Sequence, residues 1–96
     1  MMKSSENVQS EMIYGLFEDN NVDGQAVVTY YNDLQTAKEK MYYKMMVTIE
    51  KMFGSVNDFL KSYRQDYCTI YDDYVYLKNK DGQKYQFRIE KVPVME

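Results

Sequence analysis

One segment of the sequence has the residue types and spacing of a metal site. Four positions of a calcium-binding EF-hand loop are matched by Asp19, Asn21, Asp23 and Gly24. The position that should supply a bidentate glutamate holds Tyr30 instead. Because hairpin turns use the same residue types for local backbone hydrogen bonds, we predict a turn here and no metal site.

An acidic pair and a lone cysteine could also do chemistry. Asp72 and Asp73 could act as paired carboxylates, but neighbouring strand residues point to opposite faces, so we expect a solvated strand end. Cys68 lacks a histidine base, because the chain contains none, and we predict a buried, inert thiol. Since phosphate-loop, zinc and serine-elbow motifs are also absent from the sequence, we expect a protein that is not an enzyme and uses no cofactor.

Tyrosine is the residue type that stands out in the composition. The chain has 11 tyrosines, against no histidine and no tryptophan. A tyrosine side chain supplies a large, rigid contact surface with a polar tip. The composition therefore indicates a protein that works by contact with a partner.

Length and charge further limit what kind of protein this chain can be. With 96 residues, of which 45% are hydrophobic, we expect a flexible arm over residues 1–10 and a single α+β domain over residues 11–96. The net charge of −3 disfavours nucleic acid as the partner. No apolar run approaches the roughly 20 residues that cross a bilayer, and the start lacks a signal-peptide pattern, so we expect a soluble, cytoplasmic protein without a membrane partner.

Two hairpins are predicted from strand-prone runs around turn sequences. The first joins residues 12–17 to residues 26–31, although a helix over residues 24–53 is an alternative for its second strand. In the second hairpin, a three-residue loop with a left-handed Gly82 would place Leu77 opposite Tyr85 and Val75 opposite Phe87. This register puts the apolar side chains on one face of the sheet.

Between the hairpins, apolar residues recur at helical spacing. We predict that Asn32 caps a helix that ends at Gly54, and that Ser55 caps a short second helix. The apolar stripe of the first helix is Leu34, Ala37, Met41, Met45, Ile49 and Met52, and that of the second is Val56, Phe59, Leu60 and Tyr63. The predicted fold is α+β, a four-stranded antiparallel sheet with two helices on one face, in the order ββααββ.

The candidate contact surface follows from this fold. The second hairpin would leave Tyr74, Tyr76 and Arg88 on the uncovered sheet face, beside Asp72. Such rings can anchor a protein interface or stack nucleic-acid bases. The acidic turn, which contains Glu18, Asp19 and Asp23, is a second candidate surface.

The net negative charge makes a protein the favoured partner, with a single-stranded nucleic-acid or nucleotide binder as the alternative. Small size, acidity and the lack of catalytic motifs suggest a stoichiometric inhibitor or adaptor, such as an anti-defence protein of a phage or mobile element. We also consider a homodimer.

Overall fold

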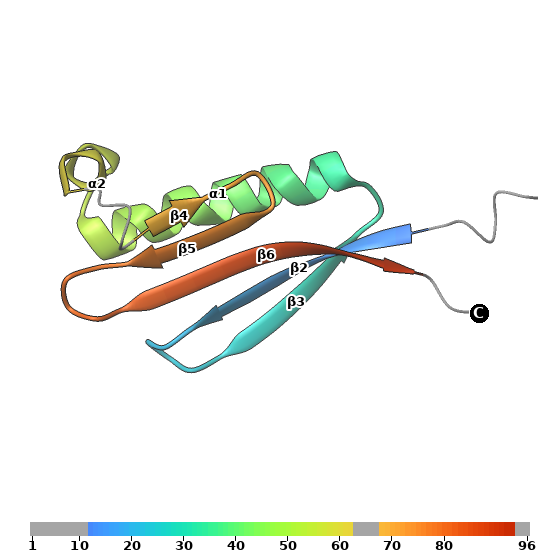
Figure 1. Ribbon diagram of the computed structural model, residues 1–96, viewed down its shortest axis with the longest axis horizontal. Coiled ribbons are helices and arrows are strands. Elements are labelled where there is room, and N and C mark those ends of the chain that lie inside the picture. The colour runs from blue at the N-terminus through green and yellow to red at the C-terminus, as the bar shows by residue number, and fades with distance from the viewer. Residues whose placement is uncertain (1–11, 63–67, 94–96) are drawn as a thin grey trace, which may run out of the picture.

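The described residues form one antiparallel sheet with two helices on one side of it (Figure 1). The computed structural model describes residues 12–62 and 68–93. The expected arm over residues 1–10 and the predicted core residue Tyr63 lie outside these ranges. In chain order the elements are β2 (Met12–Asn20), β3 (Ala26–Tyr31), α1 (Leu34–Phe53), α2 (Val56–Ser62), β4 (Cys68–Ile70), β5 (Tyr74–Lys78) and β6 (Lys84–Pro93).

The sheet has one strand more than the sequence indicated. An α+β fold with an antiparallel sheet and two helices is confirmed, but the predicted four strands in the order ββααββ are wrong. The additional strand is β4, and the strands lie side by side in the order β3-β2-β6-β5-β4. Since β4 spans only Cys68–Ile70, it is too short to show an alternating pattern, and its pairing with β5 defines it.

The first hairpin is formed by β2 and β3, so the helical alternative for residues 24–31 is wrong. Its turn uses side chains as local acceptors. Asn20 Oδ1 accepts hydrogen bonds from the backbone N–H groups of Val22 and Asp23, both at 2.9 Å. Asp23 Oδ1 accepts one from the N–H of Gln25 at 3.1 Å. These bonds explain why a hairpin turn resembles a calcium loop in sequence.

The second hairpin has the predicted register. Val75 pairs with Phe87 and Leu77 with Tyr85. The loop is closed by a hydrogen bond of 3.1 Å from Asn79 N to Gln83 O, and Gly82 inside it has a φ of 84°, which a side chain would strain. The hydrophobic pattern and the glycine position together were therefore sufficient to set this pairing.

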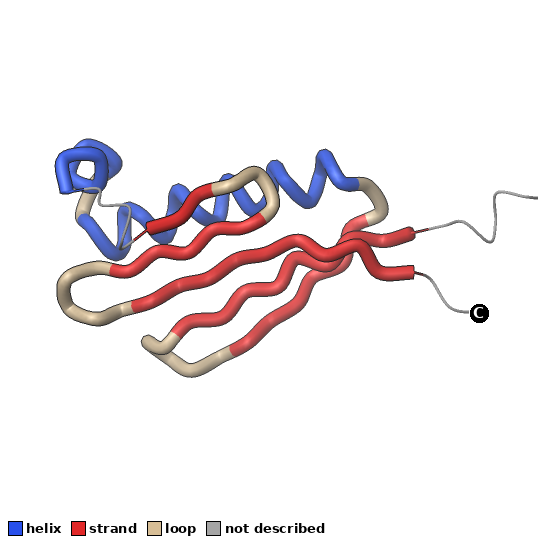
Figure 2. Tube along the Cα trace, viewed as in Figure 1, coloured by secondary structure: helices blue, strands red, loops and turns tan. Residues whose placement is uncertain are grey.

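The core lies between the sheet and α1, and the two helices lie on the same side of the sheet in Figure 2. From α1 the buried residues are Ala37, Met41, Met45, Thr48 and Ile49. Phe59 joins α2 to this core through an edge contact with Phe53, with ring centres 5.0 Å apart.

Two residues of the predicted apolar stripes, Leu34 and Leu60, are exposed. Leu34 lies one turn before Ala37, the first buried residue of α1. Leu60 follows the buried Phe59, and successive helical residues are rotated by about 100°, so a helix as short as α2 buries one of the two. The helical periodicity was correct, but Leu34 at the start of the first stripe and Leu60 inside the second were wrongly assigned to the core.

The helix caps were predicted to within one residue. Ser55 caps α2 as expected, because its Oγ accepts a hydrogen bond from Asp58 N at 3.0 Å. For α1 the predicted cap Asn32 is wrong, and Asp33 is the cap. The carboxylate of Asp33 accepts bonds from both the N–H and the hydroxyl of Thr36, each at 2.8 Å, and this double contact favours Asp33 over its neighbour.

The Asp33 cap makes stability depend on pH. Because Thr36 donates to the ionised carboxylate, the pKa of Asp33 lies below its ordinary value of 3.8. A carboxylate whose pKa is lowered by folding stabilises the fold at any pH above its ordinary pKa. This contribution is lost as the pH falls through the lowered pKa of the folded state. The variant Asp33→Asn keeps a capping side chain that does not titrate. We therefore expect its melting temperature to fall less than that of the parent protein when the pH is lowered from about 5 to about 2. An equal or larger loss in the variant would contradict the cap.

Candidate partner-binding surface

One face of the sheet is turned away from both helices (Figure 1), and we call it the open face. Side chains alternate between the two faces of a strand. Because Leu16, Val75 and Phe87 are buried in the core on the helix side, the alternate residues of each strand lie on the other side. The open face consists of Ile13, Gly15, Phe17, Asp19, Ala26, Val28, Tyr30, Thr69, Tyr74, Tyr76, Lys78, Lys84, Gln86, Arg88, Glu90 and Val92.

A row of paired side chains crosses the centre of the open face. Phe17 of β2 pairs with Val28 of β3 on one side and with Arg88 of β6 on the other, and Arg88 pairs with Tyr74 of β5. The guanidinium carbon of Arg88 lies 4.6 Å from the centre of the Phe17 ring. Arg88 Nε donates to Glu90 Oε2 at 2.6 Å. These two contacts hold Arg88 over the Phe17 ring, with its side chain 38% exposed.

A glycine brings two further rings onto this face. Gly15 pairs directly with Tyr30. A Cβ atom at Gly15 would lie 2.8 Å from Phe17 Cε1 and 3.3 Å from Tyr30 Cε1, so both rings lie over the bare backbone of the glycine. Tyr30 remains 53% exposed. Sequence reasoning missed Phe17 and Tyr30, although strand alternation applied to the first hairpin would have placed both beside Gly15.

Of the residues proposed from the sequence, Tyr74, Tyr76 and Arg88 lie together on the open face. The tyrosines are half-buried there. Asp72 does not join them. It lies in the exposed turn between β4 and β5, and its Oδ2 is 3.1 Å from Nζ of Lys38 on α1. The structure thus places Asp72 against the helix.

The acidic residues near the first turn do not form one cluster. Glu18 faces α1, where its Oε2 lies 3.3 Å from Nζ of Lys44. Asp19, the next residue, lies exposed on the open face, and Asp23 lies in the turn. Strand alternation therefore divides Glu18, Asp19 and Asp23 among three places.

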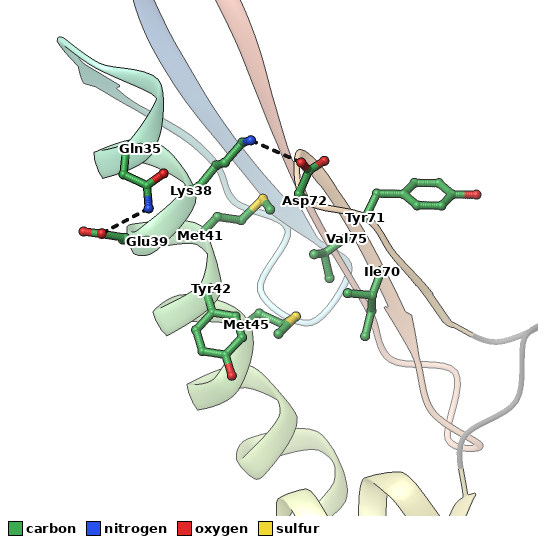
Figure 3. Close-up of a pocket in the computed structure, with 10 residues that line it drawn as sticks. All are labelled: Gln35, Lys38, Glu39, Met41, Tyr42, Met45, Ile70, Tyr71, Asp72 and Val75. Carbon is green, nitrogen blue, oxygen red and sulfur yellow. Dashed lines mark hydrogen bonds and ion pairs between the residues drawn. The ribbon is translucent and has the colours of Figure 1, made fainter.

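A groove of about 550 Å³ lies between α1 and the strands β4 and β5 (Figure 3). Apolar side chains from both walls, including Met41, Met45 and Val75, line it. Four of its polar side chains form two pairs: Lys38 contacts Asp72, and Gln35 Nε2 donates to Glu39 at 3.2 Å. The groove can accept an apolar group, but these pairings leave few polar atoms to orient a small ligand.

Cys68 and the acidic side chains are the groups that the sequence offered for chemistry. Cys68 is buried, as predicted, and its Sγ lies 3.8 Å from the carbonyl oxygen of Lys78. Burial raises the pKa of the Cys68 thiol, so the thiol stays protonated at neutral pH. Within residues 12–62 and 68–93, no three histidine, cysteine, aspartate or glutamate side chains are grouped to hold a metal ion.

The fold defines an α+β protein whose antiparallel sheet carries helices on one side. Comparison with protein-family models, with curated proteins and with solved structures finds no match to this chain. Neither α1 nor α2 is both long and apolar enough to cross a membrane.

Proposed function

We propose that the protein is a non-catalytic module that binds a protein partner through the open face. The observation that carries this proposal is the central row, in which Arg88 stacks on Phe17 next to Tyr74. Tyrosine and arginine are enriched among the residues that dominate binding energy at interfaces. Because Arg88 and the rings are already held by their neighbours, little conformational entropy would be lost on binding.

The charges around the row support a protein partner more than a nucleic acid. Basic side chains on the open face are Lys78, Lys84 and Arg88, and acidic ones are Asp19 and Glu90. This mixture resembles the polar rim of a protein interface. The basic groups beside aromatic rings favour the alternative, a single-stranded nucleic-acid or nucleotide binder. The net charge of −3 on the whole chain opposes it.

A more specific form of the proposal is an inhibitor of a host defence protein, encoded by a phage or mobile element and acting in the cytoplasm. Its support is the small size and acidity of the chain. The homodimer considered from the sequence would use the outer edge of β3 in the described sheet, which adjoins the open face.

The open face is tested by removing its tyrosines. We expect the double variant Tyr74→Ala, Tyr76→Ala to weaken binding to a partner recovered by affinity capture by at least tenfold, about 1.4 kcal/mol. The reason is that both rings would lie inside the interface. The dissociation constant is measured by calorimetry, after circular dichroism has confirmed that the variant is folded.

The matched control is Tyr42→Ala, Tyr43→Ala, because these tyrosines are 61% and 67% exposed on α1, away from the open face. This control should bind normally. If the control loses affinity and the Tyr74/Tyr76 variant does not, the partner binds the helix side and the proposal fails. If the bound molecule is a nucleic acid, affinity should fall steeply as salt concentration rises.

A further inference from the structure

The outer edge of β3 is the least protected part of the sheet. β3 is an edge strand in the described sheet, and its residues Ala26–Tyr31 carry no charge and include no proline. Its register with β2 runs without a bulge, and Val27 and Val28 are 49% and 39% exposed. Edge strands are usually protected by lysine, proline, bulges or shortness. The opposite edge, β4, is short, whereas β3 has none of these protections.

The backbone groups at this edge follow from the hydrogen bonds of the neighbouring strands. Asn21 N donates to Lys84 O, so the odd-numbered residues of β2 point their backbone groups toward β6. The backbone N–H and C=O groups of even-numbered residues such as Leu16 then point toward β3, where Leu16 pairs with Thr29. In β3 the odd-numbered residues therefore bond to β2. The N–H and C=O groups of Ala26, Val28 and Tyr30 therefore point outward at the edge of the described sheet.

We propose that two copies of the chain pair through β3, antiparallel, with Val28 on the two-fold axis. In this register Ala26 lies opposite Tyr30 of the second copy, and Val28 lies opposite itself. Each residue whose backbone groups point outward thus faces a residue of the same kind in the second copy. Each such pair exchanges two backbone hydrogen bonds. The two sheets become one continuous sheet, in a symmetric interface of the kind most homodimers use.

The side chains fit this pairing on both faces. On the open face, the small Ala26 lies opposite the large Tyr30 of the second copy. On the helix side, Val27 lies opposite Thr29, and cross-strand pairs of β-branched residues are favourable. No charged residue lies inside the paired segment, so symmetry brings no like charges together there. The nearest acidic residues, Asp23 and Asp33, lie beyond the strand ends.

This self-match is the reason to favour a second copy over another protein. The paired segment is short, and interfaces of small area are typically weak. We expect a concentration-dependent dimer with a dissociation constant in the micromolar range. The dimer does not depend on the partner-binding proposal, but it would join the open faces of both copies into one wider surface.

The experiment is sedimentation equilibrium from low micromolar to millimolar protein, with Val28→Pro as the diagnostic variant. Proline removes the outward N–H at the centre of the new pairing. The same N–H makes no bond to β2, and proline is tolerated on edge strands, so the monomer should keep its fold. We expect Val28→Pro to weaken dimerisation by roughly tenfold or more. Val28→Lys, which places two like charges at the axis, should do the same.

Two controls make the outcome decisive. Val28→Thr keeps the N–H and the strand preference, so it should still form the dimer. Hydrogen exchange should show the amides of Ala26, Val28 and Tyr30 becoming protected as the wild-type concentration rises. A wild-type chain that is monomeric at millimolar concentration would overturn the proposal. So would a folded Val28→Pro variant that dimerises as strongly as the wild type.

Discussion

Replacing Phe87 by alanine is expected to lower the free energy of unfolding by about 3–5 kcal/mol. Phe87 is 3% exposed and belongs to the core cluster between the sheet and α1. It pairs with Val75 on β5 and with Glu18 on β2, so the cavity would open at the centre of the sheet. A small domain has a total stability of similar size, so the variant should be mostly unfolded at moderate urea concentration.

The matched control for Phe87→Ala is Tyr76→Ala. Tyr76 lies on β5, next to the strand that carries Phe87, but its ring is half-buried on the open face. Its loss should cost about 1 kcal/mol or less, the usual size of a cross-strand contact. Urea melts of both variants give the comparison. Similar losses at the two positions would mean that the two faces of the sheet have been exchanged.

The register of the second hairpin could be predicted because the alternative is costly. Shifting the pairing of β5 and β6 by one residue would turn Val75 and Phe87 toward solvent, so the apolar pattern permits one register. By contrast, the central pairing of β2 with β6 joins residues far apart in the chain. No local pattern specifies it, and the predicted sheet had no strand order.

The lack of a local signal for the pairing of β2 with β6 also explains which residues of the candidate site were missed. Tyr74, Tyr76 and Arg88 come from one hairpin, and local alternation was enough to group them. Phe17 meets Arg88 only through the pairing of β2 with β6, so the stacked pair could not be derived from either hairpin alone. Asp72 was placed beside the tyrosines by extending strand logic into a turn. In the structure it lies against Lys38 of α1.

The open face and the outer β3 edge of the described sheet are two parts of one surface. Val28 and Tyr30 belong to both, since their side chains lie on the open face and their backbone groups point to the edge. Tyr74 and Tyr76 lie on β5, separated from β3 by β2 and β6. Variants at Tyr74 and Tyr76 therefore test partner binding without changing the β3 edge, and Val28→Pro tests pairing without removing those rings.

The second large effect is expected at Asn79, where one buried amide holds the second hairpin to α1. Asn79 Oδ1 accepts hydrogen bonds from the N–H groups of Asp81 and Gln83, at 3.1 and 3.0 Å. Its Nδ2 donates to Gln83 Oε1 at 2.7 Å and to the carbonyl of Met52 at 3.4 Å. Met52 is in the last turn of α1, where carbonyl groups lack partners within the helix.

Asn79→Ala should therefore lower the free energy of unfolding by about 2–3 kcal/mol, because it removes a buried amide and leaves its partly buried donors and acceptors without partners. Asn21→Ala is the matched control. Asn21 makes similar bonds, to Gly82 O at 3.0 Å and from Lys84 N at 2.8 Å, but it is exposed, so water can replace the lost amide. Its loss should cost about 1 kcal/mol or less. Urea melts that show equal losses for the two asparagines would mean that the Asn79 amide is not buried, and that the second hairpin is not held to the end of α1.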